Sequence, residues 1–68
     1  MNVSQSDFEF MKECLCRDII TILVEEKGMS LASAFDLLYN SDIYSKLSDP
    51  TTGLFFQSPR YVLSYLQI

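Results

Sequence analysis

The chain has 68 residues, a net charge of −4 at pH 7 and an isoelectric point near 4.4. This length allows one domain, residues 1–68, with one hydrophobic core. The negative charge disfavours direct binding to nucleic acid or to an acidic membrane surface. Hydrophobic residues make up 49% of the sequence, and so small a domain usually needs a very apolar core, a second copy or both to be stable. We therefore expect a domain that self-associates as a homodimer.

Residues that commonly carry out chemistry are scarce. The sequence has no histidine, which removes the most common metal ligand and general base. Cys14 and Cys16 lie in a predicted helix and point about 160° apart, so they cannot bond to each other or share a metal from that helix. We expect two buried thiols in a reducing compartment, with an intermolecular disulfide as the alternative. We predict no catalytic, cofactor or metal site, and hence no enzyme.

The hydrophobic residues do not form a membrane span. The longest apolar run covers residues 19–24 and is interrupted by Thr21. A transmembrane helix needs about 20 apolar residues. We therefore expect a soluble, cytoplasmic protein.

A long first helix is predicted over residues 5–27. Ser4 is a suitable N-cap, Val3 and Phe8 are placed for a hydrophobic staple, and Gly28 can supply the left-handed residue that ends the helix. Residues at spacings of three and four form its predicted core stripe: Phe8, Met11, Leu15, Ile19, Ile22 and Leu23.

Other apolar residues of this helix lie largely off that stripe. They are Phe10, Cys14, Ile20 and Val24. A helix that is apolar nearly all round is either central in its fold or half covered by another protomer. The rest of the chain is short, so we predict that these four residues form a dimer face.

The second and third helices are predicted over residues 31–39 and 42–47. Ser30 and Ser41 are their N-caps, and Asn40 is expected to end the second helix in a left-handed conformation. The predicted core stripe of the second helix is Leu31, Ala34, Phe35 and Leu38.

The last third of the chain begins with a turn at residues 49–53, where Pro50 fixes one backbone angle and Gly53 takes a positive φ. Residues 54–57 carry no helix start signal and are predicted to be extended. Ser58 and Pro59 then start a last helix that runs nearly to Ile68. The predicted fold is all-α: three main helices, one short helix, and a brief extended segment before the last helix.

Aromatic residues around this segment are the candidate partner-binding surface. They are Phe55, Phe56, Tyr61 and Tyr65, with Arg60 beside them. An exposed extended segment can bind a partner by strand addition. In the alternative interpretation one phenylalanine faces the core, the other faces outward, and the tyrosines lie at the rim.

Three familiar functional motifs lack essential parts. Gly53 follows two threonines, but a phosphate-binding loop needs more glycines and a lysine. Asp42 and Asp49 are better explained as helix-start and turn residues than as an acid–base pair, and Ser58 is a cap without a base. Residues 29–47 imitate half of a helix-turn-helix, but the second helix has a single lysine to face DNA.

The order of these elements resembles a group of small uncharacterised bacterial proteins, known as a domain of unknown function. The features that carry the resemblance are the long apolar helix, the connection 27–30, the Ala-Phe-x-Leu-Leu pattern of residues 34–38, and the Thr-Thr-Gly of residues 51–53 before an aromatic lead-in. They cover about residues 8–66. Some members are encoded beside ADP-ribosyltransferase-like toxins, which implies a regulatory partner. This chain departs from the group by having Pro50 where the group has a histidine, so no functional residue is carried over.

The sequence thus predicts a protein–protein interaction module, homodimeric through its first helix, with an antitoxin-like regulatory role as the most concrete hypothesis. Two alternatives stay open. The chain could be the dimerisation part of a DNA-associated transcriptional regulator, or a small ligand-binding helical bundle with a pocket near Phe55 and Tyr61.

Overall fold

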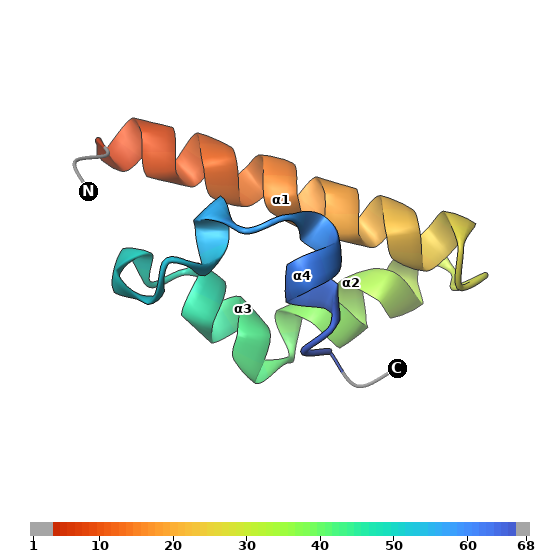
Figure 1. Cartoon of the computed structure of the whole chain (residues 1–68). Helices are drawn as coiled ribbons and strands as arrows, with labels where there is room; N and C mark the ends of the chain where they lie inside the picture. The colour runs from red at the N-terminus through yellow and green to blue at the C-terminus, as the bar shows by residue number, and fades with distance from the viewer. Residues whose placement is uncertain (1–3, 67–68) are drawn as a thin grey trace.

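A computed structural model describes residues 4–66 of the chain (Figure 1). The order of its elements is α1 (Gln5–Glu25), α2 (Leu31–Tyr39), α3 (Asp42–Leu47), the 3₁₀ turns η1 (Pro50–Thr52) and η2 (Leu54–Phe56), and α4 (Pro59–Leu63). The fold is all-α, and residues 4–66 contain no strand. Two predictions fall outside the described residues: the role of Val3 in a hydrophobic staple, and the continuation of the last helix past residue 66.

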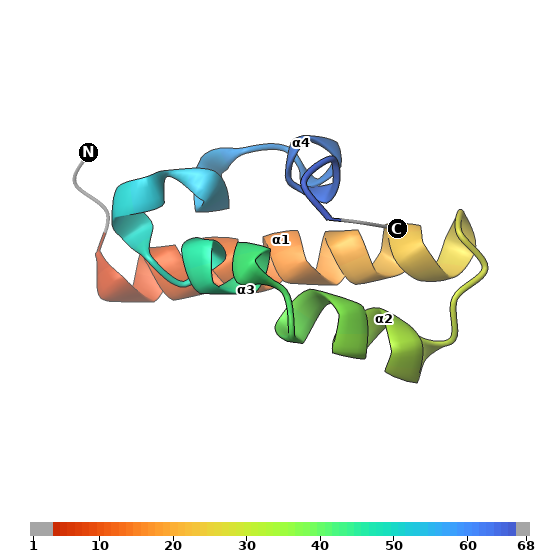
Figure 2. The same cartoon turned by 90° about the horizontal axis from the view of Figure 1, so that it is seen from below.

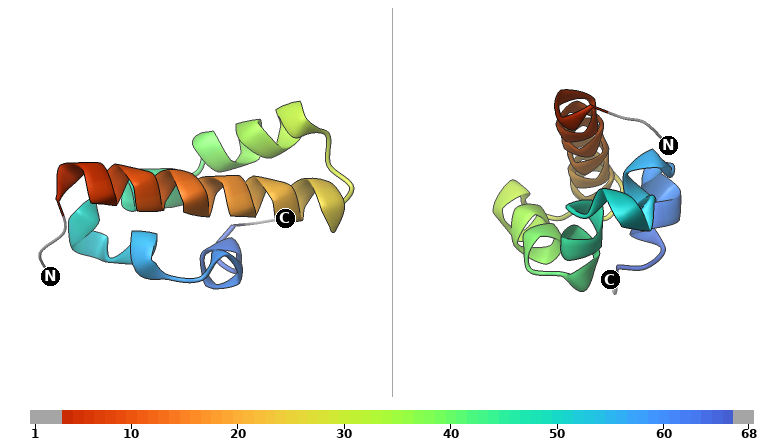
Figure 3. Two further views of the ribbon diagram at one scale, coloured as in Figure 1. Left: turned by 90° about the horizontal axis from the view of Figure 1, so that it is seen from above. Right: turned by 90° about the vertical axis from the view of Figure 1, so that its left-hand side faces the viewer.

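Helix α1 runs the length of an elongated molecule that measures 37 by 18 by 17 Å. The other helices lie below α1 in Figure 1, with α2 under one edge of that face and η2 and α4 under the other (Figures 2 and 3). The core forms where these short elements meet one face of α1. Its fully buried large side chains are Ile19, Leu23, Leu38, Leu47 and Val62.

The predicted helix starts are confirmed. Four serines act as N-caps, and each side-chain oxygen accepts a hydrogen bond from the backbone N–H three residues later: Ser4, Ser30, Ser41 and Ser58. These bonds satisfy N–H groups that the first turn of a helix cannot. Gly28 and Gly53 have φ values of 70° and 71°, as the turn chemistry predicted.

The predicted helix ends are less accurate. Helix α1 ends at Glu25, two residues before the predicted end. Asn40 has φ −97° and is not left-handed; its side-chain amide donates instead to the backbone oxygen of Asp36. Helix α4 ends at Leu63, because Tyr65 and Leu66 bond to carbonyls three residues back and Ser64 Oγ donates to Tyr61 O. Within residues 4–66 only α1 and α2 exceed six residues, so the prediction of three main helices is not confirmed.

The prediction of an extended segment at residues 54–57 is wrong. Residues 54–56 form the 3₁₀ turn η2, in which Phe56 N–H donates to Gly53 O and Gln57 N–H to Leu54 O. The cause is tertiary: Phe55 is buried, and its ring packs edge-on against Phe8 with 4.8 Å between centroids. The 3₁₀ turn, unlike an extended segment, places the Phe55 side chain against α1.

The core stripe of α1 is confirmed, whereas that of α2 is half wrong. In α1, Phe8, Leu15, Ile19 and Leu23 are buried, and Met11 and Ile22 are half-buried. In α2, Ala34 and Leu38 are fully buried, but Leu31 is 59% and Phe35 is 38% exposed. The two exposed residues lie about 60° round the helix from the two buried ones. A single neighbouring helix cannot cover the full width of that apolar face.

No helix within residues 4–66 combines the length and hydrophobicity that crossing a membrane requires.

Replacing Leu38 and Leu31 by alanine compares a buried and an exposed leucine in the same helix. Leu38→Ala should lower the free energy of unfolding by about 2–5 kcal/mol, because it opens a cavity in the core. Leu31→Ala should change it by less than about 0.5 kcal/mol. Urea unfolding followed by circular dichroism at low protein concentration measures both. Equal losses for the two variants would contradict this description of the core.

Candidate functional site

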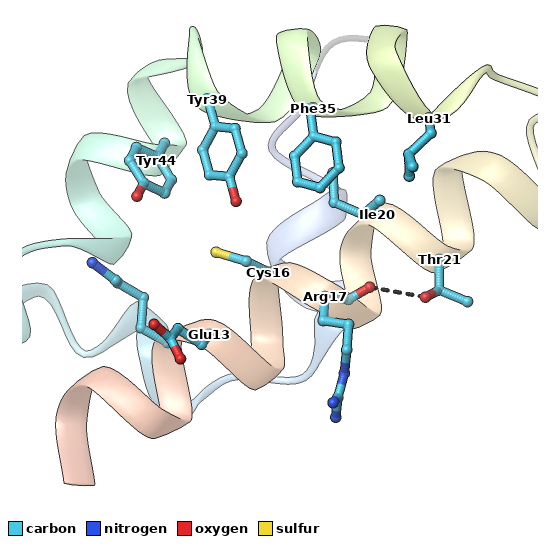
Figure 4. Close-up of a pocket in the computed structure, with 10 residues that line it drawn as sticks. Glu13, Cys16, Arg17, Ile20, Thr21, Leu31, Phe35, Tyr39 and Tyr44 are labelled. Atoms are coloured by element: carbon cyan, nitrogen blue, oxygen red, sulfur yellow. Dashed lines mark hydrogen bonds between the residues drawn. The ribbon is translucent and has the colours of Figure 1, made fainter. Parts of the chain in front are cut away.

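A groove of about 540 Å³ runs between α1 and α2 (Figure 4). Its α2 wall is a row of three large side chains spaced four residues apart, Leu31, Phe35 and Tyr39, and Tyr44 of α3 continues the row. The α1 wall comprises Lys12, Glu13, Cys16, Arg17, Ile20 and Thr21. The spacing of four keeps the row on one side of α2.

The aromatic rings of the groove fix one another. Phe35 stacks on Tyr39 with centroids 5.3 Å apart, and Tyr39 meets Tyr44 edge-on at 4.7 Å. Lys12 Nζ lies 5.6 Å from the centroid of the Tyr44 ring, within the range of a cation–π interaction. This wall is therefore preorganised, so a partner would not have to order it on binding.

The floor of the groove is apolar. Cys16 and Ile20 are 6% and 5% exposed. Burial raises the pKa of the Cys16 thiol above its ordinary value, which keeps the sulfur protonated and unreactive near neutral pH. Burial also raises the pKa of Tyr39. A buried thiol that stays protonated is a weak nucleophile.

Two opposite charges stand free at the rim of the groove. Glu13 and Arg17 are exposed and line it, one turn apart on α1. The one ion pair within residues 4–66 is formed elsewhere, between Arg60 and Glu26. Glu13 and Arg17 are therefore available to groups outside the protomer.

The four residues of the predicted dimer face have different environments. Phe10 is 68% exposed, the most exposed large hydrophobic residue among those described. Cys14 and Val24 are half-buried. The prediction is wrong for Ile20, because α2 covers this residue and it forms part of the groove floor instead of an open face.

The five residues of the predicted partner-binding surface are not one surface. Phe55 is 3% exposed and belongs to the core, which corrects the prediction, whereas Phe56 is 39% exposed. The alternative of one inward and one outward phenylalanine is therefore the observed one. Tyr61 and Tyr65 are exposed neighbours whose hydroxyl oxygens lie 3.0 Å apart.

Arg60, the fifth residue, is occupied within the chain. Its guanidinium donates two hydrogen bonds to the carboxylate of Glu26, at the C-terminal end of α1. These bonds lower the pKa of Glu26 below its ordinary value. Arg60 therefore ties α4 to α1.

Two further polar features bear on the candidate sites. Residues 4–66 contain no group of three His, Cys, Asp or Glu side chains placed to hold a metal ion. Asp49 accepts hydrogen bonds from the backbone N–H and hydroxyl of Thr51, which lower its pKa and identify it as a turn residue.

No protein-family model, curated protein or solved structure matches the chain.

Sequence reasoning missed the aromatic row because it placed Leu31 and Phe35 in the core. One signal was present: the nine residues of α2 include a single charged residue, Asp36, although two apolar positions per turn suffice for a core stripe. A helix with more apolar side chains than its core contact can bury leaves a second apolar face.

The two thiols should differ in reactivity. Cys14 should react with iodoacetamide at least tenfold faster than Cys16 at pH 8, because Cys16 is buried and its thiol pKa is raised. Peptide mass spectrometry after timed alkylation measures both rates. Equal rates would show that the groove floor opens to solvent.

The Glu26–Arg60 pair should give a small pH dependence. A lowered pKa in the folded state means that the pair stabilises the protein above the ordinary Glu26 pKa of 4.5, and that this contribution disappears as the pH falls through the lowered value. Arg60→Gln should therefore lower the melting temperature at pH 7, and the difference from the wild type should shrink as the pH falls through the lowered Glu26 pKa. The difference in melting temperature between the two proteins isolates this pair from other acids. A difference that does not change with pH would contradict it.

Proposed function

We propose that this chain is a protein-interaction module and that its working surface is the groove between α1 and α2. The observation that supports it best is the exposed row Leu31, Phe35 and Tyr39, on a helix with one charged residue. Centres of protein interfaces are enriched in aromatic residues and depleted of charge. Isolated exposed hydrophobic residues are common on monomers, but a continuous row beside an apolar floor is typical of a binding surface.

The energy available at this surface is appreciable. Full burial of one large apolar side chain contributes about 1.5–3 kcal/mol, and the row leaves 38–59% of each of its three side chains exposed. A partner that covers the row therefore recovers a few kcal/mol before polar contacts are counted. The stacked rings add little ordering cost.

The competing functions have weaker support. A ligand pocket around Phe55 and Tyr61 is disfavoured because Phe55 is covered by Phe8. A direct DNA contact is disfavoured by the net charge of −4, although dimerisation within a larger regulator would use the same groove. We place the interaction in the cytoplasm, where two free thiols persist.

The finer hypothesis is an antitoxin-like regulatory partner that neutralises a second protein. Its support is the acidic balance of the chain, which favours association with a basic surface.

Substitution within the groove tests the interaction function. Phe35→Ser should abolish most binding to proteins from the source cells and most self-association, because it removes the centre of the row. Tyr65→Ser is the matched control, since Tyr65 is a similarly exposed aromatic residue outside the groove, at 52%. Affinity capture with quantitative mass spectrometry, together with light scattering, compares the three proteins. A wild-type chain that neither self-associates nor captures any protein in a Phe35-dependent manner would refute the proposal.

A further inference from the structure

We propose that the occupant of the groove face is a second copy of this chain, with the two α1 helices antiparallel across a twofold axis that passes near Arg17. This inference rests on the proposed interaction function and specifies its partner. It is carried by the spacing of apolar residues on α1 and α2, by the free charges at the rim and by the size of the face.

The apolar residues of α1 are spaced symmetrically about Arg17. Phe10 and Val24 are each seven residues from it, and seven residues turn an α-helix by about 700°, which is about 20° short of two full turns. All three residues therefore lie along one face. When two such helices pair antiparallel with Arg17 at the centre, Phe10 of each copy meets Val24 of the other. The most exposed large side chain of the chain is then covered by an apolar one.

The row on α2 has the same symmetry. Leu31 and Tyr39 are each four residues from Phe35, and Phe35 lines the groove together with Arg17 (Figure 4). One twofold axis therefore passes near the centre of both helices. A self-complementary surface of this type is what an isologous dimer requires.

The rim charges complement each other in this arrangement. Glu13 lies one turn, about 6 Å, from Arg17 along α1. In the antiparallel pair Arg17 of each copy extends toward Glu13 of the other, so that two reciprocal ion pairs form and the two arginines diverge. Neither residue has an ion-pair partner within the described part of the protomer. Charge complementarity thus selects the same axis as the apolar spacing.

The dimensions of the face suit a stable dimer. A rectangle of 37 by 18 Å covers about 670 Å², and accessible surface exceeds projected area, so a long face can supply the roughly 800 Å² per partner of a standard interface. An end of the molecule, 18 by 17 Å, is less than half as large. Only a long face is adequate, and the groove face is the one with the aromatic row.

Sedimentation velocity from about 1 μM to 1 mM on the full chain tests the dimer. The wild type should be dimeric, or should show a monomer–dimer equilibrium, within this concentration range. Phe10→Ser should raise the dimer dissociation constant at least tenfold, and it should fold normally because Phe10 is 68% exposed. Tyr61→Ser, which removes an aromatic residue 45% exposed on α4, should leave the constant within twofold.

Charge reversal tests the register. Glu13→Arg and Arg17→Glu should each raise the dissociation constant about fivefold, and the protein with both changes should return to within twofold of the wild type, as expected for reciprocal pairs. Lys46→Glu, the same charge change on α3, is the control. Circular dichroism melts of each variant separate dissociation from unfolding.

Three results would overturn the inference. They are a wild type that stays monomeric to 1 mM, a dimer insensitive to Phe10→Ser, and a double charge variant that is no better than the single ones. A monomer that still captures another protein through Phe35 would remove the dimer and leave the interaction module standing. Absence of both activities would remove both.

Discussion

The fold depends on one constraint: α2, η2 and α4 bury their apolar side chains against one face of α1, and α3 and η1 pack mainly against each other and against α2 and η2. No other element is long enough to serve as a scaffold, since α2 has nine residues and α3 and α4 have six and five. Such helices are unstable alone and persist through tertiary packing. The groove arises from the same constraint, because α2 packs on α1 through Ala34 and Leu38, which leaves Leu31 and Phe35 at the edge of that contact.

Local rules predicted the starts of the elements well, because those depend on nearby atoms. A serine cap needs only the backbone N–H three residues later, and Gly53 needs only a turn that demands positive φ. Helix ends were harder: Ser64 competes for a carbonyl within its own turn, a choice that hydrophobic periodicity does not encode. The segment around Phe55 was predicted wrongly because its conformation is set by Phe8, 47 positions earlier in the chain.

The candidate site was predictable only in part. The sequence showed an excess of apolar residues on α1, and Phe10 is indeed exposed, but periodicity could not decide which side α2 would cover. That choice buried Ile20 and exposed the row on α2. Which of two apolar faces becomes core is a property of the whole packing arrangement, and a single-helix pattern does not contain it.

The long-range contacts also indicate which part of the fold forms first and which part opens most easily. Helices α1 and α2 are neighbours in sequence, whereas Phe8–Phe55 and Glu26–Arg60 each close a long loop. Loop closure costs entropy that short connections avoid, so the α1–α2 hairpin should assemble early and the C-terminal third should dock afterwards. That third contributes four buried side chains, Phe55, Val62, Leu63 and Leu66, but its helical elements have five residues or fewer, so we expect its amides to exchange with deuterium before those of α1. The chain would then have a module that can detach while the aromatic row remains in place.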